Sequence, residues 1–545
     1  MAIHSARGAT KRPAPNISQV VKLPAPTKGI DGRIGLGQNS PEHCIYTYNL
    51  LCGEYGMKIR KGWREYANTI TSGSGTGVKT IIPYTGALAS ASDDKLFAVT
   101  NEGIWDVSTD GDTSPTKMLT FATTTDGAGE GVYTSYVTDA DAHLIFYADP
   151  LNGLFTYDDA AGTWAQTAGI TGITAANVNF VVVHKLRIWL IESGSSNAWY
   201  LDVGAIAGEA TKFQFGSQFK HGGSLAGLYN WTLDGGAGVD DWLVAVSDSG
   251  DVIPYSGGDP SISSWTIQGV YYIGAIIGGN QCATETGGDL YLLSTYGLTN
   301  LSELINGVKS YESDSNSLGS KMSYMLRADI INYRYAKGWS VRFLPCDGVL
   351  VVTTPVTTDG VYKQYAYELA TNSFGLWRDI PMLSNTSWSD NIFVGTLDNR
   401  ILIMDDELDN VAIVPPLGVL NGEEIQFSTL LTFNDLGASG VFKRLNLVRP
   451  DFISTFAVTF DTRFNLDYQL GASPINFATT SDAQEVWDTG VWDTAVWASS
   501  VPNNVGKIGG ASGYGRTAAV AIKGVGRSST WFISVDVMWT PAGVL

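Results

Sequence analysis

The chain has 545 residues, 34 Lys and Arg against 53 Asp and Glu, and a formal net charge of −19 at pH 7. Hydrophobic residues make up 44%, charged residues only 16%, and Gly is plentiful at 62, which excludes a disordered chain and is typical of β-rich proteins. Because phosphate binding needs clustered Lys and Arg, the acidic balance argues against a nucleic-acid clamp. Both ordinary solubility and a passage through which DNA slides without being held are compatible with this charge.

The N-terminal region is predicted in two parts. Residues 1–16 are a basic arm without periodic pattern, predicted to be flexible, either as a disordered tail or as an arm that docks on a neighbouring subunit. No apolar stretch follows these charges, so we expect no signal peptide, and we expect no membrane span elsewhere. Residues 17–70 contain two short predicted strands, and the Gly-rich segment 72–77 is expected to be a flexible hinge.

Seven copies of one short unit follow, each with an apolar run, a tight Gly, Asn or Asp turn, and a second run that carries aromatics. Turn chemistry of this kind predicts a β-hairpin. The copies begin 37 to 61 residues apart, whereas a propeller blade takes roughly 40 to 50 residues. Their first strand residues are Leu96, Leu144, Val181, Trp242, Leu290, Val349 and Ile392.

A single hairpin cannot bury both of its faces, but a ring of small sheets packed side by side can. The repeats therefore predict a β-propeller body over residues 78–406, with an open linear β-sandwich array as the alternative. A helical insertion is expected near 317–336, where apolar residues recur at helical spacing. These residues are Leu318, Met322, Met325, Leu326 and Ile330.

The pattern changes after the acidic run 405–410 and the prolines that follow it. Residues 420–545 have longer alternating strands, which predict a separate antiparallel β-sandwich or barrel, called the platform domain below. The fold class expected for the whole chain is thus mainly β, a propeller-like body plus this platform.

Residues able to carry chemistry are sparse and scattered. The five His residues, at 4, 43, 143, 184 and 221, fall in separate segments without a metal or nucleophile motif. The acidic segments 106–114 and 138–143 lack the ligand alternation of a calcium loop. The four Cys residues are interpreted as buried free thiols. We therefore assign no catalytic, cofactor-binding or metal-binding residue, and we expect no cofactor and no enzymatic activity.

Two segments, 156–164 and 370–377, approach the Asp-box of sialidase-type propellers, although their spacing is off by one residue. We interpret both as hairpin turns in which Gly frees the backbone and the closing Trp packs between blades.

Two blocks, residues 23–67 and 333–406, resemble the tail nozzle, or tail hub (tail tubular), proteins of short-tailed bacteriophages. The first covers residues 23–67, with Asn49 and the Arg-Lys-Gly-Trp stretch 60–63 in the places where that family has its characteristic residues. The second covers residues 333–406, with Asn399 where the family usually has Gly. The C-terminal stretches 513–524 and 531–539 also resemble that family's closing strands.

The resemblance implies a structural virion protein of the phage tail, assembled in the host cytoplasm. It would form a homohexameric ring below the adaptor ring (head-to-tail connector) and the portal, with tail fibres or spikes as further possible neighbours. The channel would retain the packaged genome until adsorption and then serve its ejection, without sequence-specific DNA binding. The resemblance also implies that residues 17–70 pack with residues 420–545.

A second interpretation is a carbohydrate-binding or glycan-cleaving propeller of a tail receptor-binding protein. Trp487, Trp492 and Trp497 recur every five residues, a period that suits loops presenting indole rings to sugars.

Overall fold

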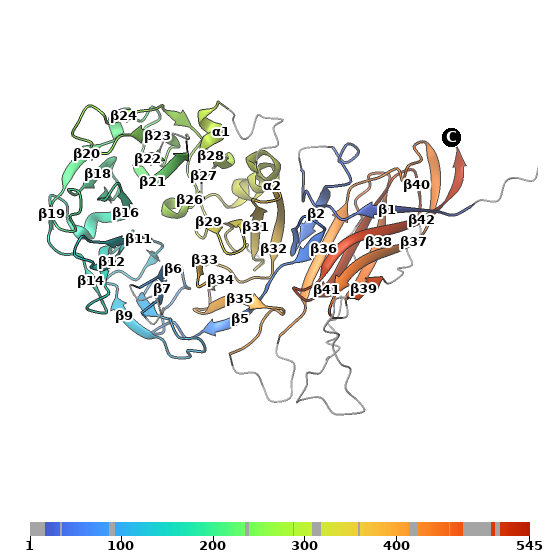
Figure 1. Ribbon diagram of the computed structural model, residues 1–545, viewed down its shortest axis with the longest axis horizontal. Coiled ribbons are helices and arrows are strands. Elements are labelled where there is room, and N and C mark those ends of the chain that lie inside the picture. Colours follow the sequence, from blue (N-terminus) through green and yellow to red (C-terminus); the bar gives the residue numbers. More distant parts are fainter. Residues whose placement is uncertain are drawn as a thin grey trace, which may run out of the picture.

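A ring of seven β-blades and a two-layer β-sandwich lie side by side, and the sheet of one blade continues into the sandwich (Figure 1). This computed structural model describes residues 17–32, 35–86, 93–234, 239–286, 288–307, 318–357, 360–413, 422–456, 458–471, 503–506 and 513–544. The basic arm 1–16 and the segment with Trp487, Trp492 and Trp497 lie outside the described residues.

Six of the predicted hairpins each occupy a separate small sheet, and the hairpin of blade six lies in an eight-stranded sheet shared with the sandwich, which confirms the repeat as the blade unit. Blade one contains β6 (Thr80–Tyr84), β7 (Lys95–Thr100), β8 (Gly103–Asp106) and β9 (Thr116–Thr120). Blade two contains β11 (Val132–Val137), β12 (His143–Asp149), β13 (Gly153–Asp158) and β14 (Thr163–Gln166). Blade three contains β16 (Val178–His184), β17 (Arg187–Glu192), β18 (Asn197–Tyr200) and β20 (Thr211–Gln214).

The later blades vary more in size. Blade four contains β21 (Leu225–Asp234), β22 (Val239–Ser247), β23 (Asp251–Ser256), β24 (Thr266–Ile267) and β25 (Tyr271–Tyr272). Blade five contains β26 (Ala283–Thr286), β27 (Asp289–Ser294) and β28 (Gly297–Asn300), followed by α1 (Leu301–Ile305) and α2 (Leu318–Tyr333). Blade six contains β29 (Ser340–Leu344), β30 (Val349–Thr353), β31 (Lys363–Glu368) and β32 (Ser373–Arg378). Short strands outside the blade sheets are β10 (Asp126–Gly129), β15 (Ile170–Thr171) and β19 (Gly208–Glu209).

Blade seven closes the ring. Its strands β33 (Ser384–Trp388), β34 (Asn391–Gly395) and β35 (Ile401–Asp406) are completed by β5 (Gly62–Ala67), which pairs antiparallel with β35. The first strand of every blade contacts the first strand of the next, and β33 contacts β6. The mainly β, propeller-like fold is therefore confirmed, and the alternative of a linear array is wrong.

Separate apolar clusters fill the spaces between blades, as radial packing requires. Trp164 packs against Phe97 at 5.4 Å between ring centroids, joining blades two and one. Trp377 lies in a cluster shared by blades six and seven. The Asp-box-like segments are thus hairpin turns with inter-blade indoles, as predicted. Helix α2, in the region where a helical insertion was expected, buries Met322, Leu326 and Ile330 against blades five and six.

The platform is a two-layer sandwich. Its first sheet contains β1 (Gln19–Pro24), β3 (Leu50–Cys52), β4 (Met57–Ile59), β37 (Val441–Ser454), β39 (Asn503–Gly506), β40 (Gly513–Gly515) and β42 (Trp531–Val544). The second contains β2 (Cys44–Tyr48), β36 (Ile425–Leu431), β38 (Thr459–Leu466) and β41 (Ala518–Gly526). The core between the sheets includes Phe427, Phe452 and Trp539, each about 1% exposed.

The sheet of blade six and the second sheet of the platform form one continuous sheet. Strand β2 pairs antiparallel with β36 of the platform and in parallel with β32 of blade six, so one eight-stranded sheet runs from the propeller into the sandwich. The expectation that all of residues 17–70 pack on the platform does not hold for β5, because blade seven lacks an outer strand of its own and takes β5 instead.

Candidate functional site at the channel mouth and the joint

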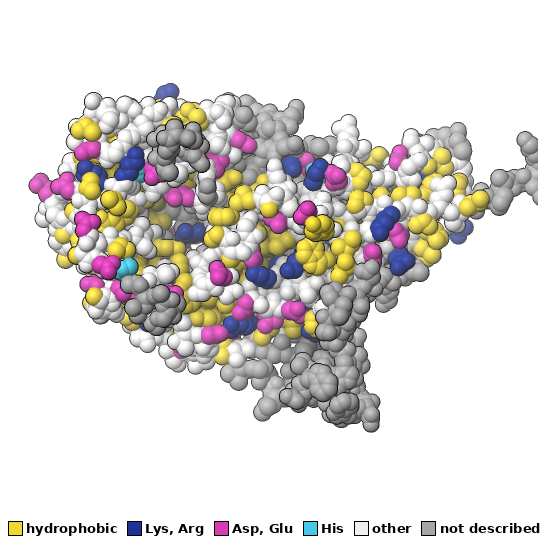
Figure 2. All heavy atoms as spheres, in the orientation of Figure 1, with side chains coloured by type: hydrophobic (Ala, Val, Ile, Leu, Met, Phe, Trp, Pro, Cys, Tyr) yellow, Lys and Arg dark blue, Asp and Glu magenta, His cyan; other side chains and the backbone are white. Residues whose placement is uncertain are grey.

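A cavity of about 680 Å³ lies at the mouth of the propeller channel. Connectors that lead into the first strands of several blades line it, together with loops between second and third strands. Figure 2 shows this hollow near the centre of the ring. Its charged lining residues are Lys79, Asp126, Glu130, Arg334 and Lys337.

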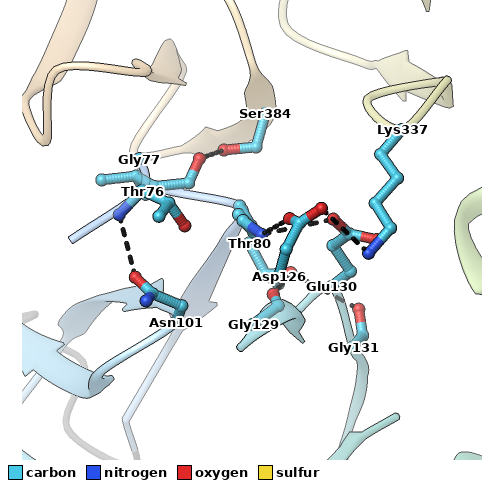
Figure 3. Close-up of polar contacts among 12 residues, drawn as sticks. Thr76, Gly77, Thr80, Asn101, Asp126, Gly129, Glu130, Gly131, Lys337 and Ser384 are labelled. Carbon is cyan, nitrogen blue, oxygen red and sulfur yellow. Dashed lines mark hydrogen bonds and ion pairs between the residues drawn. The ribbon is translucent and has the colours of Figure 1, made fainter. Parts of the chain in front are cut away.

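Lys79 is the centre of the charged network in this cavity, and Figure 3 labels its other members, Asp126, Glu130 and Lys337. Its side chain is only 6% exposed, and its Nζ lies 3.0 Å from Asp126 Oδ1 and 3.4 Å from Glu130 Oε1. Lys337 approaches the other Asp126 oxygen at 3.2 Å. The hydrogen bond from Lys79 holds the pKa of Asp126 below its usual 3.8. The carboxylates thus compensate the buried ammonium group, as burial of a charge requires.

Neutral hydrogen bonds join three blades beside this network (Figure 3). Ser384 of blade seven donates from Oγ to the Val78 carbonyl at 2.8 Å. Thr80 of blade one donates to the Gly129 carbonyl at 2.7 Å, at the entry to blade two. The mouth is therefore braced at the point where the first and last blades meet.

The segment 72–77, expected as a flexible hinge, is held by side chains. Glu102 accepts hydrogen bonds from the Ser72 and Ser74 amides at 2.6 and 2.9 Å. Burial opposes ionisation of Glu102, but these hydrogen bonds outweigh it and lower its pKa. Asn399, at φ 60°, accepts from the Gly77 amide at 2.9 Å. Specific hydrogen bonds thus hold the segment 72–77 in place against the propeller body, and the expected flexible hinge is absent.

The second site is the joint, which we define as Asn49, Arg60 and Asp409 with the backbone groups they bind. Arg60 has a fully buried side chain and forms a bidentate pair with Asp409, at 2.8 Å from Nη1 and 2.7 Å from Nη2. Its remaining N–H groups donate to Asn49 Oδ1 at 3.0 Å and to the Lys61 and Arg378 carbonyls. All five guanidinium donors are therefore used.

Asn49 completes the joint from the platform side. It adopts φ 58°, a left-handed conformation that Asn tolerates better than most residues. Its Nδ2 donates to the Gln426 carbonyl on β36 at 2.8 Å, and its Oδ1 accepts from the Arg378 amide on β32 at 2.8 Å. One side chain thus binds the backbone of both bodies.

The residues that first carried the family resemblance meet here. Asn49 and Arg60 form the joint, and Gly62 lies so close to the Leu408 backbone that a Cβ atom would overlap it. Trp63 is buried in the cluster between blades six and seven. Sequence reasoning marked these residues but missed Asp409, since nothing local distinguishes it from the other acids of the run 405–410.

Other candidate groups do not assemble. Within the described residues, no group of three or more His, Cys, Asp or Glu could hold a metal ion. Cys44, Cys52 and Cys282 are buried free thiols, as predicted, whereas Cys346 is free but only partly buried. Burial raises the pKa of Cys52 to about 12. Sequence reasoning missed a His221–Asp251 pair, 2.7 Å apart, in which the carboxylate also accepts the His221 amide hydrogen. This pair fastens the segment before β21 onto β23.

Comparisons with known proteins add little to this geometry. No protein-family model and no curated protein matches the chain. Two similar solved structures are of BBS1N in complex with ARL6DN. The one soaked with lead has 11% identity and a TM-score of 0.29, over 45% of this chain and 74% of that chain. The one soaked with mercury has 10% identity and a TM-score of 0.36, over 63% and 97%. Likenesses this distant carry no argument about function.

In the part of the chain that the structure describes, no helix is both long and apolar enough to cross a bilayer.

Proposed function

We propose that this chain is a structural subunit of a ring-shaped nozzle in the tail of a short-tailed bacteriophage, where it forms part of the conduit and gate for the genome. The observation that carries the proposal is the joint. Asn49 and Arg60, the residues of the family-like block, fix the propeller to the platform through a buried ion pair and a continuous sheet. A subunit that withstands the force of a packaged genome needs such a rigid connection.

The size of the cavity at the channel mouth favours a passage between subunits over one through a single propeller. A cavity of about 680 Å³ has the volume of a small-molecule site, typically about 300 to 1,000 Å³. Duplex DNA, whose major groove alone is about 12 Å wide, does not fit such a space. In this proposal the DNA therefore passes through the centre of a ring of subunits, and each propeller is a peripheral body.

The charge distribution supports a conduit that does not retain DNA. On the face shown in Figure 2, acidic and basic side chains are interspersed, and the whole chain carries −19. Phosphates would meet a surface that repels them on average.

Imaging of the purified full-length chain by electron microscopy, with sedimentation over a hundredfold concentration range, tests the proposal. We expect closed rings with a central hole, near six times the mass of one chain. Single chains at every concentration, both alone and with a cognate adaptor ring, would contradict it.

A further inference from the structure

A second cavity, about 300 Å³, lies where the propeller meets the platform. We call it the seam cleft and define it by Tyr46, Tyr48, Arg378, Ser428 and Lys523, which all line it. Arg378 ends the outer strand of blade six, whereas Ser428 and Lys523 belong to platform strands β36 and β41. The cleft thus has one wall from each body.

Strand register explains why these side chains converge. Tyr48 is paired with Leu376 and with Ser428, and Ser428 is paired with Lys523. Directly paired residues project from the same face of a sheet, as do residues two apart on one strand. Tyr48, Ser428 and Lys523 therefore share a face with Arg378, which lies two residues after Leu376.

Within the described residues, neither Arg378 nor Lys523 takes part in an ion pair, although the chain has 53 acids for 34 Lys and Arg. Arg378 Nε is buried without a hydrogen-bond partner. Two carboxylates are close in the fold: Asp379 lines the cleft, and Asp461 is paired with Lys523 across the strands but accepts the Thr462 amide hydrogen at 2.8 Å.

The guanidinium of Arg378 is also preorganised. Its central carbon lies 3.8 Å from the ring centroid of Tyr48. Such stacking satisfies the face of a guanidinium but leaves its N–H edge free to donate in the plane.

We propose that the seam cleft binds a small oxyanion that carries a carboxylate or phosphate group. Arg378 donates hydrogen bonds from its planar edge, Lys523 supplies a second positive charge, and the hydroxyl of Ser428 can add a neutral donor. A volume of about 300 Å³ suits an anion the size of citrate or a phosphate ester. Such a ligand would bridge blade six and the platform. The inference does not rest on the nozzle function.

Isothermal titration of the full chain with inorganic phosphate and with citrate, at constant ionic strength set by chloride, tests this assignment. We expect saturable binding of at least one of the two anions, which identifies the preferred group. A hydrogen bond between charged groups contributes substantially to the free energy of binding. Arg378→Gln and Lys523→Gln should therefore each weaken anion binding about tenfold or more.

Arg449→Gln and Lys212→Gln are the matched controls, since they remove the same charges from β37 and from blade three. Both should bind the anion as the wild type does. Melting curves without ligand verify that all four variants are folded. No saturable binding of either anion, or equal weakening in the controls, would overturn the proposal.

Discussion

At the scale of single residues, buried charge decides which side chains are indispensable. Arg60 is completely buried and Asp409 nearly so, and each is the other's only charged partner in the joint. A buried pair contributes little over an apolar replacement, but breaking one by removing a single partner is costly.

Replacing Arg60 with Met should therefore destabilise the protein by about 3–5 kcal/mol, because Met keeps much of the side-chain volume but leaves the Asp409 carboxylate uncompensated. Urea unfolding followed by tryptophan fluorescence measures the loss.

Adding Asp409→Asn to the same variant should recover part of the stability, since the orphaned charge is removed. Lys28→Met, at an exposed pair with Glu42, serves as the control and should leave the midpoint unchanged. A loss in Arg60→Met no larger than in this control would show that the joint does not depend on the ion pair.

His184 makes stability depend on pH. Asn230 donates from Nδ2 to the Val183 carbonyl, so its Oδ1, 2.8 Å from His184 Nδ1, accepts from that nitrogen. The other ring nitrogen, Nε2, is buried and has no hydrogen-bond partner among the residues that the structure describes. Burial accordingly lowers the pKa of His184 below its usual 6.5.

The sign of the effect follows from proton uptake. Below about pH 6.5 the unfolded chain binds a proton at this histidine, while the folded chain resists it, so stability falls as the pH decreases. We expect the free energy of unfolding to drop between pH 7 and pH 5 and to drop less in His184→Gln. Identical slopes in the two proteins would refute the assignment.

At the scale of elements, local and distant pairings differ in how far they can be predicted. The seven hairpins were predictable because each turn and both of its strands lie within a short stretch, as at 96–106 and 144–158. The pairing of β5 with β35 joins opposite ends of the propeller sequence. The six residues of β5 contain no signal that predicts pairing with β35. The closure of blade seven by β5 is therefore known only from the structure.

The same contrast holds for the sites. Asn49 and Arg60 stood out through their motif, but Lys79 and Asp126 are ordinary residues in separate connectors, and only the closed ring brings them together. The cavity that they line forms only when all the blades close into a ring. No local sequence pattern predicts it.

A substitution at Gly62 tests whether the pairing of β5 with β35 contributes to the stability of the propeller. A side chain at this position would overlap the Leu408 backbone, which displaces β5 from β35. Gly62→Val should cost about 1–3 kcal/mol of stability, a typical effect of overpacking, and should speed amide hydrogen exchange selectively in β35.

Gly35→Val is the matched control, because an added Cβ atom there meets nothing within 4 Å. Its exchange pattern should equal that of the wild type. If β35 remains as protected in Gly62→Val as in this control, β5 does not hold the ring closed.

At the scale of the whole molecule, net charge governs encounters with polyanions. With −19 on 545 residues, we expect no retardation of duplex DNA in a gel-shift assay at physiological salt, because binding requires release of counterions by clustered cations. A histone or another basic protein provides the positive control. Tight, salt-sensitive retention of DNA by the purified chain would contradict a passive conduit.

The pairing of β1 with β42 imposes an order on biosynthesis. Ribosomes make β5 early and β35 long before the C-terminal strands, so the propeller can close on a nascent chain. Strand β1 must wait for β42, which emerges last among the described strands. A translation product truncated between β35 and β42 would therefore carry a finished propeller without a complete sandwich, and only chains translated through β42 could offer an intact platform for assembly.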